Sequence, residues 1–206
     1  PCERDGVFPD DFYSTTNLET VVRLGSSWVP VEHPEMDCGL VVTDGRVRTV
    51  PVSDVRAGDE VVCGAGGIKV VLPPVERSGD TFEFMSSSVS SEKPQALLVR
   101  QIAERMREVK EDGGKVLWVG GPGIVHTGAA PAFTALVDAG YVDVLFAGNA
   151  LATHDIESAL YGTSLGVDLS QGKGVEHGHE HHIRTINTIR SAGSITAAVE
   201  QGVLTS

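Results

Sequence analysis

The chain has 206 residues, of which 41% are hydrophobic and 21% charged, in the ordinary range for globular proteins. A formal net charge of −12 argues against nucleic acid or an anionic membrane surface as a partner, because both require a basic face. Three cysteines cannot all pair and no apolar run reaches the ~18 residues that span a bilayer, so we expect a cytoplasmic protein in a reducing compartment.

Residues 1–80 contain short valine-rich runs separated by turn-forming residues. Asp44-Gly45, between two of these runs, is the strongest hairpin signal in the chain. Many short strands with frequent turns predict a small β-rich domain over residues 1–80, resembling a barrel or a sandwich. The runs are Glu19–Leu24, Ser27–Val31, Gly39–Thr43, Val47–Pro51, Glu60–Cys63 and Gly67–Leu72.

After residue 90 the apolar period changes from two to 3.6, which predicts a helix over Glu92–Lys110. Lys115–Val119 is an apolar run without alternation, typical of a strand buried on both faces. The remaining elements follow in chain order: a glycine-rich loop at Gly120–Gly128, helix at about Ala129–Ala139, strand at Val142–Ala147, short helix at Asp155–Tyr161 and two helical pieces within Ile183–Gln201.

A strand, a helix and a strand with a short return predict a right-handed βαβ unit with parallel strands. Residues 81–206 are therefore expected to form the first portion of a Rossmann-like domain, and the fold class is α/β. Two parallel strands cannot hide both faces of a sheet, so further strands must come from a following segment or another subunit. We favour a fragment of a longer protein.

The loop at Gly120–Gly128 lies between a strand and a helix, where a backbone without side chains can approach a phosphate. Gly121 and Gly123 fit the first two glycines of the dinucleotide fingerprint, but His126 stands where the third is expected. From the loop sequence alone, a dinucleotide-binding loop and a tight turn without a ligand are equally good interpretations.

A partner for a ribose is expected about 20 residues after such a loop, at the end of the next strand. Gly148-Asn149-Ala150 occupies this place, and the Asn149 amide can donate to and accept from hydroxyl groups. The alternative is that Asn149 only caps the following helix. An asparagine in place of the usual acid leaves the orientation of a nucleotide open.

Histidines gather in two places. His177, His179, His181 and His182 have a spacing that suits a metal, but their glycine-flanked stretch favours a solvated or substrate-covering loop, and we assign no metal. His154-Asp155 can shuttle a proton or begin a helix. Cys38 is interpreted as a core residue rather than a nucleophile.

Several ordered motifs resemble one family, labelled the LOR/SDH bifunctional enzyme conserved region. It includes archaeal-type ornithine cyclodeaminases and the C-terminal part of the cyanobacterial arginine dihydrolase/ornithine cyclodeaminase. The resemblance runs through the whole chain, and members of the family extend further at both ends. The motifs are Phe12–Asn17, Pro34–Cys38, Phe82–Pro94, Gly121–Gly128, Gly148–Asp155 and Ala159–Asp168.

The resemblance implies conversion of L-ornithine to L-proline and ammonia, with NAD recycled rather than consumed. It places the NAD contacts of the family on Asn149 and Ala150. The position of the glycine-rich loop between a strand and a helix predicts further contacts to NAD. A homo-oligomer is also expected. Residues 1–206 alone are expected to have little activity. The loop contacts are Gly121, Gly123, His126 and Thr127, and the candidates for proton transfer are His126, Asp155 and Glu83.

Two other functions stay open at this point. The historical label of the family suggests a lysine- or saccharopine-type NAD(P)-dependent oxidoreductase, which would accumulate NADH. A non-catalytic nucleotide-binding fragment is the third hypothesis.

Overall fold

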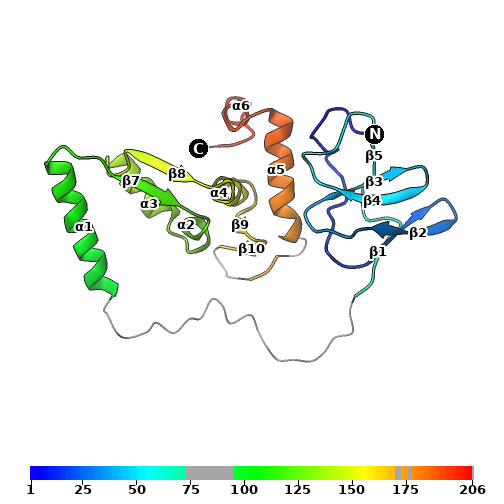
Figure 1. Ribbon diagram of the computed structural model, residues 1–206, viewed down its shortest axis with the longest axis horizontal. Coiled ribbons are helices and arrows are strands. Elements are labelled where there is room, and N and C mark those ends of the chain that lie inside the picture. Colours follow the sequence, from blue (N-terminus) through cyan, green and yellow to red (C-terminus); the bar gives the residue numbers. More distant parts are fainter. Residues whose placement is uncertain (73–94, 170–172, 176–177, 206) are drawn as a thin grey trace. The chain divides into compact units, whose positions relative to one another are not determined.

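The computed structural model describes residues 1–72, 95–169, 173–175 and 178–205 (Figure 1). The chain forms two compact units, the first from Pro1–Pro73 and Asn149–Ser206 and the second from Pro74–Gly148. The domain boundary predicted between residues 80 and 81 lies outside the described residues and stays a prediction. Among the described residues, none of the helices is both long and apolar enough to cross a membrane.

The first unit contains a six-stranded sheet in the order β5-β3-β4-β2-β1-β6. Its neighbouring strands are antiparallel except for β2 and β4, which are parallel. Each of the six predicted valine-rich runs forms a strand, so the prediction of a β-rich N-terminal part is confirmed. The strands are β1 (Thr20–Leu24), β2 (Ser27–Glu32), β3 (Gly39–Thr43), β4 (Arg46–Val50), β5 (Glu60–Val61) and β6 (Ile68–Val70).

The predicted hairpin at Asp44-Gly45 joins β3 to β4. Thr43 pairs with Arg46, so the turn has two residues. Asp44 and Gly45 have φ angles of 50° and 75°, in the left-handed region that a type I′ turn requires. Asparagine, aspartate and glycine adopt this region most readily, which explains why the sequence signal was reliable.

The second segment of the first unit is mostly helical. The α4 helix begins at Asn149, six residues earlier than predicted, so His154-Asp155 lies within a helix and does not begin one. The histidine stretch was also predicted incorrectly, because His181 and His182 are the first residues of α5 and not part of a loop. These elements are α4 (Asn149–Tyr161), β9 (Thr163–Ser164), β10 (Val167–Asp168), the 3₁₀ turn η2 (Gly178–Glu180), α5 (His181–Ala192) and α6 (Ile195–Glu200).

Helix α5 packs against the N-terminal segment, far from it in sequence. The side chain of Asn187 accepts a hydrogen bond from Phe8 N–H at 2.8 Å and donates one to Phe8 O at 3.1 Å, as a neighbouring strand would. Ile183, only 2% exposed, enters the core beside the stacked rings of Phe8 and Phe12. This core also includes Cys2, Val41, Val50 and Val55.

The second unit holds the predicted βαβ arrangement. Strands β7 and β8 are parallel, with Gly120 opposite Ala147, so the prediction of parallel strands is confirmed. The indole N–H of Trp118 donates to Tyr141 O at 3.0 Å, and its ring meets Phe133 edge-on. The elements are α1 (Gln95–Glu111), β7 (Leu117–Gly120), α2 (Gly123–His126), α3 (Ala130–Asp138) and β8 (Val144–Ala147).

The expected burial of these two strands on both faces is wrong for this chain. Val119 is 77% exposed and Phe146 is 60% exposed. A sheet of two strands has two edges, and the helices of this unit do not cover both of its faces. The apolar composition of the two runs therefore predicted strands correctly. Their burial depends on neighbouring elements that this unit does not supply.

We expect Ile183→Ala to lower the free energy of unfolding by roughly 2–5 kcal/mol, because it leaves a cavity between α5 and the sheet. Ile195→Ala on α6 is the matched control, since Ile195 is 48% exposed and its loss costs about 1 kcal/mol or less. Urea unfolding followed by circular dichroism measures both changes. Equal losses in the two variants would contradict the core assignment.

Candidate functional site

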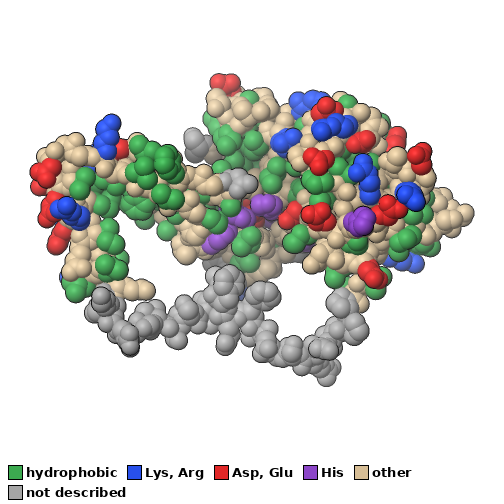
Figure 2. Space-filling model, viewed as in Figure 1, with side chains coloured by type: hydrophobic (Ala, Val, Ile, Leu, Met, Phe, Trp, Pro, Cys, Tyr) green, Lys and Arg blue, Asp and Glu red, His purple; other side chains and the backbone are tan. Residues whose placement is uncertain are grey.

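A buried carboxylate organises the polar residues between α4 and α5. Glu157 has no exposed surface. Its Oε1 accepts hydrogen bonds from Thr163 Oγ1 at 2.9 Å and Gly166 N–H at 3.1 Å. Its Oε2 accepts from His154 Nδ1 at 2.9 Å and Leu165 N–H at 3.3 Å. We call Glu157, His154, Thr163 and His181 the Glu157 network. Figure 2 shows histidine side chains gathered over this part of the first unit.

Local structure explains how these groups converge. His154 and Glu157 are three residues apart on α4, a spacing that places both side chains on one face of a helix. Leu165 and Gly166 form the turn between β9 and β10, with φ angles of 53° and 70°. This left-handed turn aims two successive N–H groups at one carboxylate.

The pKa of Glu157 follows from two opposing effects. Burial by itself raises the pKa, because a charge loses its hydration. The hydrogen bonds from Gly166, His154, Thr163 and Leu165 stabilise the charged form, and together they lower the pKa below its ordinary value. Glu157 is therefore ionised at neutral pH and can only accept hydrogen bonds.

His181 extends the network toward solvent. Its Nδ1 lies 2.8 Å from Thr163 Oγ1, and its ring is stacked on Tyr161 with the centroids 4.4 Å apart. Burial lowers the pKa of His181 below its ordinary value, although Glu157 and Glu180 act in the opposite direction. The His181 imidazole is thus neutral at pH 7. From the sequence, this residue was predicted to lie in a loop.

The geometry also brings three possible metal ligands together. One ligand atom each of His154, Glu157 and His182 lies within 4.8 Å of the others. Both oxygens of Glu157, however, already accept two hydrogen bonds each. A metal ion would have to displace these donors, so we interpret the cluster as a hydrogen-bond network. His177, from the predicted histidine cluster, lies outside the described residues.

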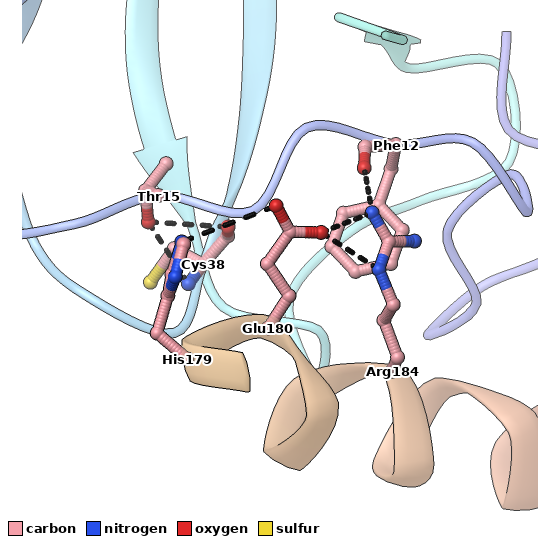
Figure 3. Close-up of polar contacts among 6 residues, drawn as sticks. All are labelled: Phe12, Thr15, Cys38, His179, Glu180 and Arg184. Atoms are coloured by element: carbon pink, nitrogen blue, oxygen red, sulfur yellow. Dashed lines mark hydrogen bonds and ion pairs between the residues drawn. The ribbon is translucent and has the colours of Figure 1, made fainter. Parts of the chain in front are cut away.

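The start of α5 is anchored to the β-rich part by one guanidinium group (Figure 3). Arg184 Nε donates to Glu180 Oε2 at 2.8 Å, four residues earlier in the chain. The same side chain donates to the backbone oxygens of Asp10 at 3.1 Å and Phe12 at 3.2 Å. These contacts fix the segment that carries His181.

Cys38 lies in the same region and is only 3% exposed. Its backbone N–H donates to Thr15 Oγ1 at 3.0 Å (Figure 3). Burial, together with the nearby carboxylates of Glu35, Asp37 and Asp54, raises the pKa of its thiol to about 11. The thiol is protonated at neutral pH, which agrees with the interpretation of Cys38 as a core residue.

A groove of about 510 Å³ lies beside η2 and the start of α5. Its apolar lining can hold a hydrocarbon chain, and Asp11 adds a carboxylate, whereas Glu180 is already paired with Arg184. This combination suits a small amine. The groove is lined by Asp11, Phe12, Tyr13, Thr16, Leu18, Gly64, Ala65, Ile68, Val70, Leu72, His179, Glu180 and Arg184.

The glycine loop of the second unit provides an open backbone surface. A Cβ atom added at Gly121 or Gly123 would meet no other atom within 4 Å. Because Gly120 lies opposite Ala147, the loop and the end of β8 share one edge of the sheet. The residues therefore fit the approach of a phosphate group to the loop.

Most backbone N–H groups of the loop already have partners within it. The N–H groups of residues 124–129 donate to carbonyl oxygens within the turn, including Thr127 N–H to Gly123 O at 3.1 Å. The hydroxyl of Thr127 also donates to Gly123 O, at 2.7 Å. His126 ends the one-turn helix α2 and is partly exposed. Among the described residues, Gly121 and Gly123 keep their N–H groups available.

The other predicted site residues lie on α4 or outside the described ranges. Asn149 and Ala150 begin α4, directly after Gly148 at the end of β8. Asp155 is exposed on α4. Glu83 lies outside the described residues. The sequence did not predict the Glu157 network, because its members lie on separate elements and do not form a known sequence motif.

Comparison with known proteins identifies relatives over the whole chain. Residues 19–99 match the family described as the first region of the C-terminal part of ArgZ-like arginine dihydrolase, and residues 100–206 match its Rossmann fold. Ornithine cyclodeaminase of Methanothermobacter thermautotrophicus is 56% identical over 98% of this chain and 50% of its own length. The chain thus spans about half the length of the curated relatives that it matches.

Two solved structures are also similar. AgrE in a ternary complex with ornithine and NAD+ has a TM-score of 0.80 and 38% identity, covering 100% of this chain and 29% of AgrE. A conserved putative LOR/SDH protein from Methanococcus maripaludis S2 has a TM-score of 0.51 and 48% identity, covering 100% of this chain and 64% of that protein.

Glu157→Gln should lower the free energy of unfolding by roughly 1–3 kcal/mol at neutral pH, because one oxygen that accepts hydrogen bonds is replaced by a donor. The folded pKa of Glu157 is lowered, so its stabilising effect is present above the unfolded pKa, about 4.3, and is lost as pH falls through the folded pKa. Urea unfolding of both proteins between pH 3 and 7 tests this prediction. A difference that does not shrink below about pH 4.5 would contradict it.

The contact between Gly166 and Gly178 gives a second prediction. A Cβ atom at Gly178 would lie 2.5 Å from Gly166 O, so Gly178→Ala must shift the turn that binds Glu157. We expect a lower melting temperature, by about 4 °C or more. Gly174→Ala is the control, because a Cβ atom there meets no atom within 4 Å. Similar melting temperatures for the two variants would exclude the tight contact.

Proposed function

The chain belongs to the family of the ArgZ-like C-terminal region, and from this premise we propose that it is part of an NAD-dependent ornithine cyclodeaminase. The similarity to the LOR/SDH family predicted from the sequence motifs is confirmed, as is the α/β class with a Rossmann-fold region. The observation that carries the proposal is the match of the entire chain to AgrE, solved with ornithine and NAD+.

The proposed reaction converts L-ornithine to L-proline and ammonia. NAD, when bound, takes a hydride from the amine-bearing carbon and later returns it, so none is consumed. Gly121 and Gly123 offer N–H groups and open space to its pyrophosphate. Asn149 and Ala150, the first residues of α4, are proposed to contact its ribose.

The protein must also hold a flexible diamine and exclude water while an unstable imine exists. The groove beside Glu180 supports this role, since its apolar lining and the carboxylate of Asp11 match the methylene chain and one amine of ornithine. For proton transfer, His126, Asp155 and Glu83 stay proposals. A homo-oligomer and a cytoplasmic location are likewise proposed.

One observation favours a second function. The putative LOR/SDH protein shares 48% identity with this chain, and its label supports a lysine- or saccharopine-type oxidoreductase. The two functions differ in redox balance, because only the oxidoreductase leaves net NADH.

Incubation of the full-length protein with labelled ornithine and NAD+ separates the two functions. We expect labelled proline and ammonia in equal amounts, without absorbance from accumulated NADH. Accumulation of NADH with lysine or saccharopine would favour the second function. The absence of turnover with all three substrates would leave a non-catalytic nucleotide-binding protein.

Gly121→Val tests the role of the loop in binding NAD. We expect the Kd for NAD+ to rise at least about tenfold, because the side chain fills the space over the backbone, and each factor of ten corresponds to about 1.4 kcal/mol. Folding should be unaffected, since a Cβ atom at Gly121 meets no atom within 4 Å. Titration calorimetry measures the Kd, with Gly174→Ala as the control. An unchanged Kd would remove the loop from the nucleotide site.

A further inference from the structure

We propose that His181 is the proton-transfer group of the reaction, and that Glu157 and Thr163 position it through a directed chain of hydrogen bonds. This inference rests on the proposed function and adds a residue role to it. The chain begins at the buried carboxylate of Glu157, passes through Thr163 Oγ1 and ends at His181 Nδ1, with contacts of 2.9 and 2.8 Å.

The direction of this chain follows from the number of protons available. The ionised Glu157 has no proton to donate, so the single hydroxyl proton of Thr163 points to Glu157. Thr163 Oγ1 must then accept the second hydrogen bond, and His181 Nδ1 carries the proton that forms it. In the neutral imidazole, Nε2 is left with a lone pair and can accept a proton.

A purely structural role for Glu157 explains fewer of these contacts than a role in positioning His181. A clamp for the β9–β10 turn needs only the carboxylate and the N–H groups of Leu165 and Gly166. It does not require an imidazole whose Nδ1 is held by Thr163 and whose face is stacked on Tyr161 with an interplanar angle of 13°. A histidine fixed at one nitrogen through an acid-supported hydrogen bond, with a lone pair on the other nitrogen, is the arrangement of a general base.

The proposed proton transfers balance over the reaction. As the hydride leaves the amine-bearing carbon, an N–H bond of that amine breaks, its electron pair forms the C=N bond, and its proton moves to His181 Nε2. The second amine then adds to this carbon while the C=N electron pair moves to the first nitrogen, and one proton of the second amine passes to that nitrogen. His181 returns the proton to the first nitrogen as the C–N bond breaks, and ammonia leaves. The cyclic iminium ion that remains takes back the hydride, so His181 ends as it began.

Several charged or titratable groups surround His181 and set its titration. Glu157 acts through Thr163, and Tyr161 covers one face of the ring. Glu180 raises the pKa of His181, whereas Arg184 and His179 lower it. Loss of the Thr163 hydroxyl removes the path by which Glu157 stabilises the protonated ring, so the pKa of His181 should fall further.

Steady-state kinetics on the full-length enzyme test the proposal. We expect His181→Gln to lower kcat about 100-fold or more, the range of general acid–base catalysis, with less than a twofold change in the Kd for NAD+. Thr163→Val should lower kcat about tenfold and move the acidic limb of the kcat/KM profile to lower pH. Thr163→Ser keeps the hydroxyl and should restore most of the rate. Thr188→Val is the control, since the Thr188 hydroxyl donates to Arg184 O within α5.

A second measurement does not depend on turnover. Diethyl pyrocarbonate acylates neutral imidazoles, and mass spectrometry of peptides gives its rate at His181 as a function of pH. We expect the midpoint of this rate to fall by about half a pH unit in Thr163→Val and to be unchanged in Thr163→Ser and Thr188→Val.

The outcomes separate the proposal from the function on which it rests. The proposal is overturned if His181→Gln keeps kcat within threefold of the wild type, or if the labelling midpoint does not move in Thr163→Val. If ornithine is not the substrate, the labelling midpoint still reports whether Glu157 and Thr163 control His181. If valine and serine at residue 163 give equal losses of kcat, Thr163 only fills space and its positioning role is excluded.

Discussion

A fully buried charge imposes strict requirements on its surroundings, and Glu157 imposes them on this protein. Without hydrogen bonds the ionised carboxylate would cost more free energy than a domain can spare. Four donors satisfy it, two from side chains and two from the turn after β9. The turn can reach it only because Leu165 and Gly166 adopt left-handed φ angles, and Gly178 packs against this turn without a side chain. One carboxylate thus holds the β9–β10 turn against α4.

The hydrophobic core adds the second constraint, because it holds α5 in the position that the network needs. Ile183 enters the core with Phe8 and Phe12, and Asn187 binds both backbone groups of Phe8. Arg184 ties the same helix to Glu180 and to the N-terminal segment. His181, at the start of α5, is therefore attached to a rigid element. A proton-transfer group benefits from such support, since its rate depends on a fixed orientation.

Prediction from sequence succeeded where the signal is local. The six valine-rich runs and the Asp44-Gly45 turn are read from neighbouring residues, and each forms the expected structure. The strands before and after the glycine loop were also identified, with their parallel direction. The start of α4 was missed because its first residues, from Asn149, follow a glycine and were interpreted as a nucleotide-binding end of the strand. The short strands β9 and β10 have two residues each, too few for any alternation to be visible.

The amino-acid sequence by itself determined the α/β class, the order of most elements and the family, because periodicity, turn residues and long motifs are all contained in contiguous segments. Only the tertiary structure decided which polar residues form a network. His154 and Glu157 come from α4, Thr163 from β9 and His181 from α5, and no one of these segments encodes the hydrogen-bond directions or the pKa values. The burial of Glu157 and the donors that surround it exist only after α4, the β9–β10 turn and α5 have packed together, and the same packing brings His181 Nδ1 to Thr163 Oγ1.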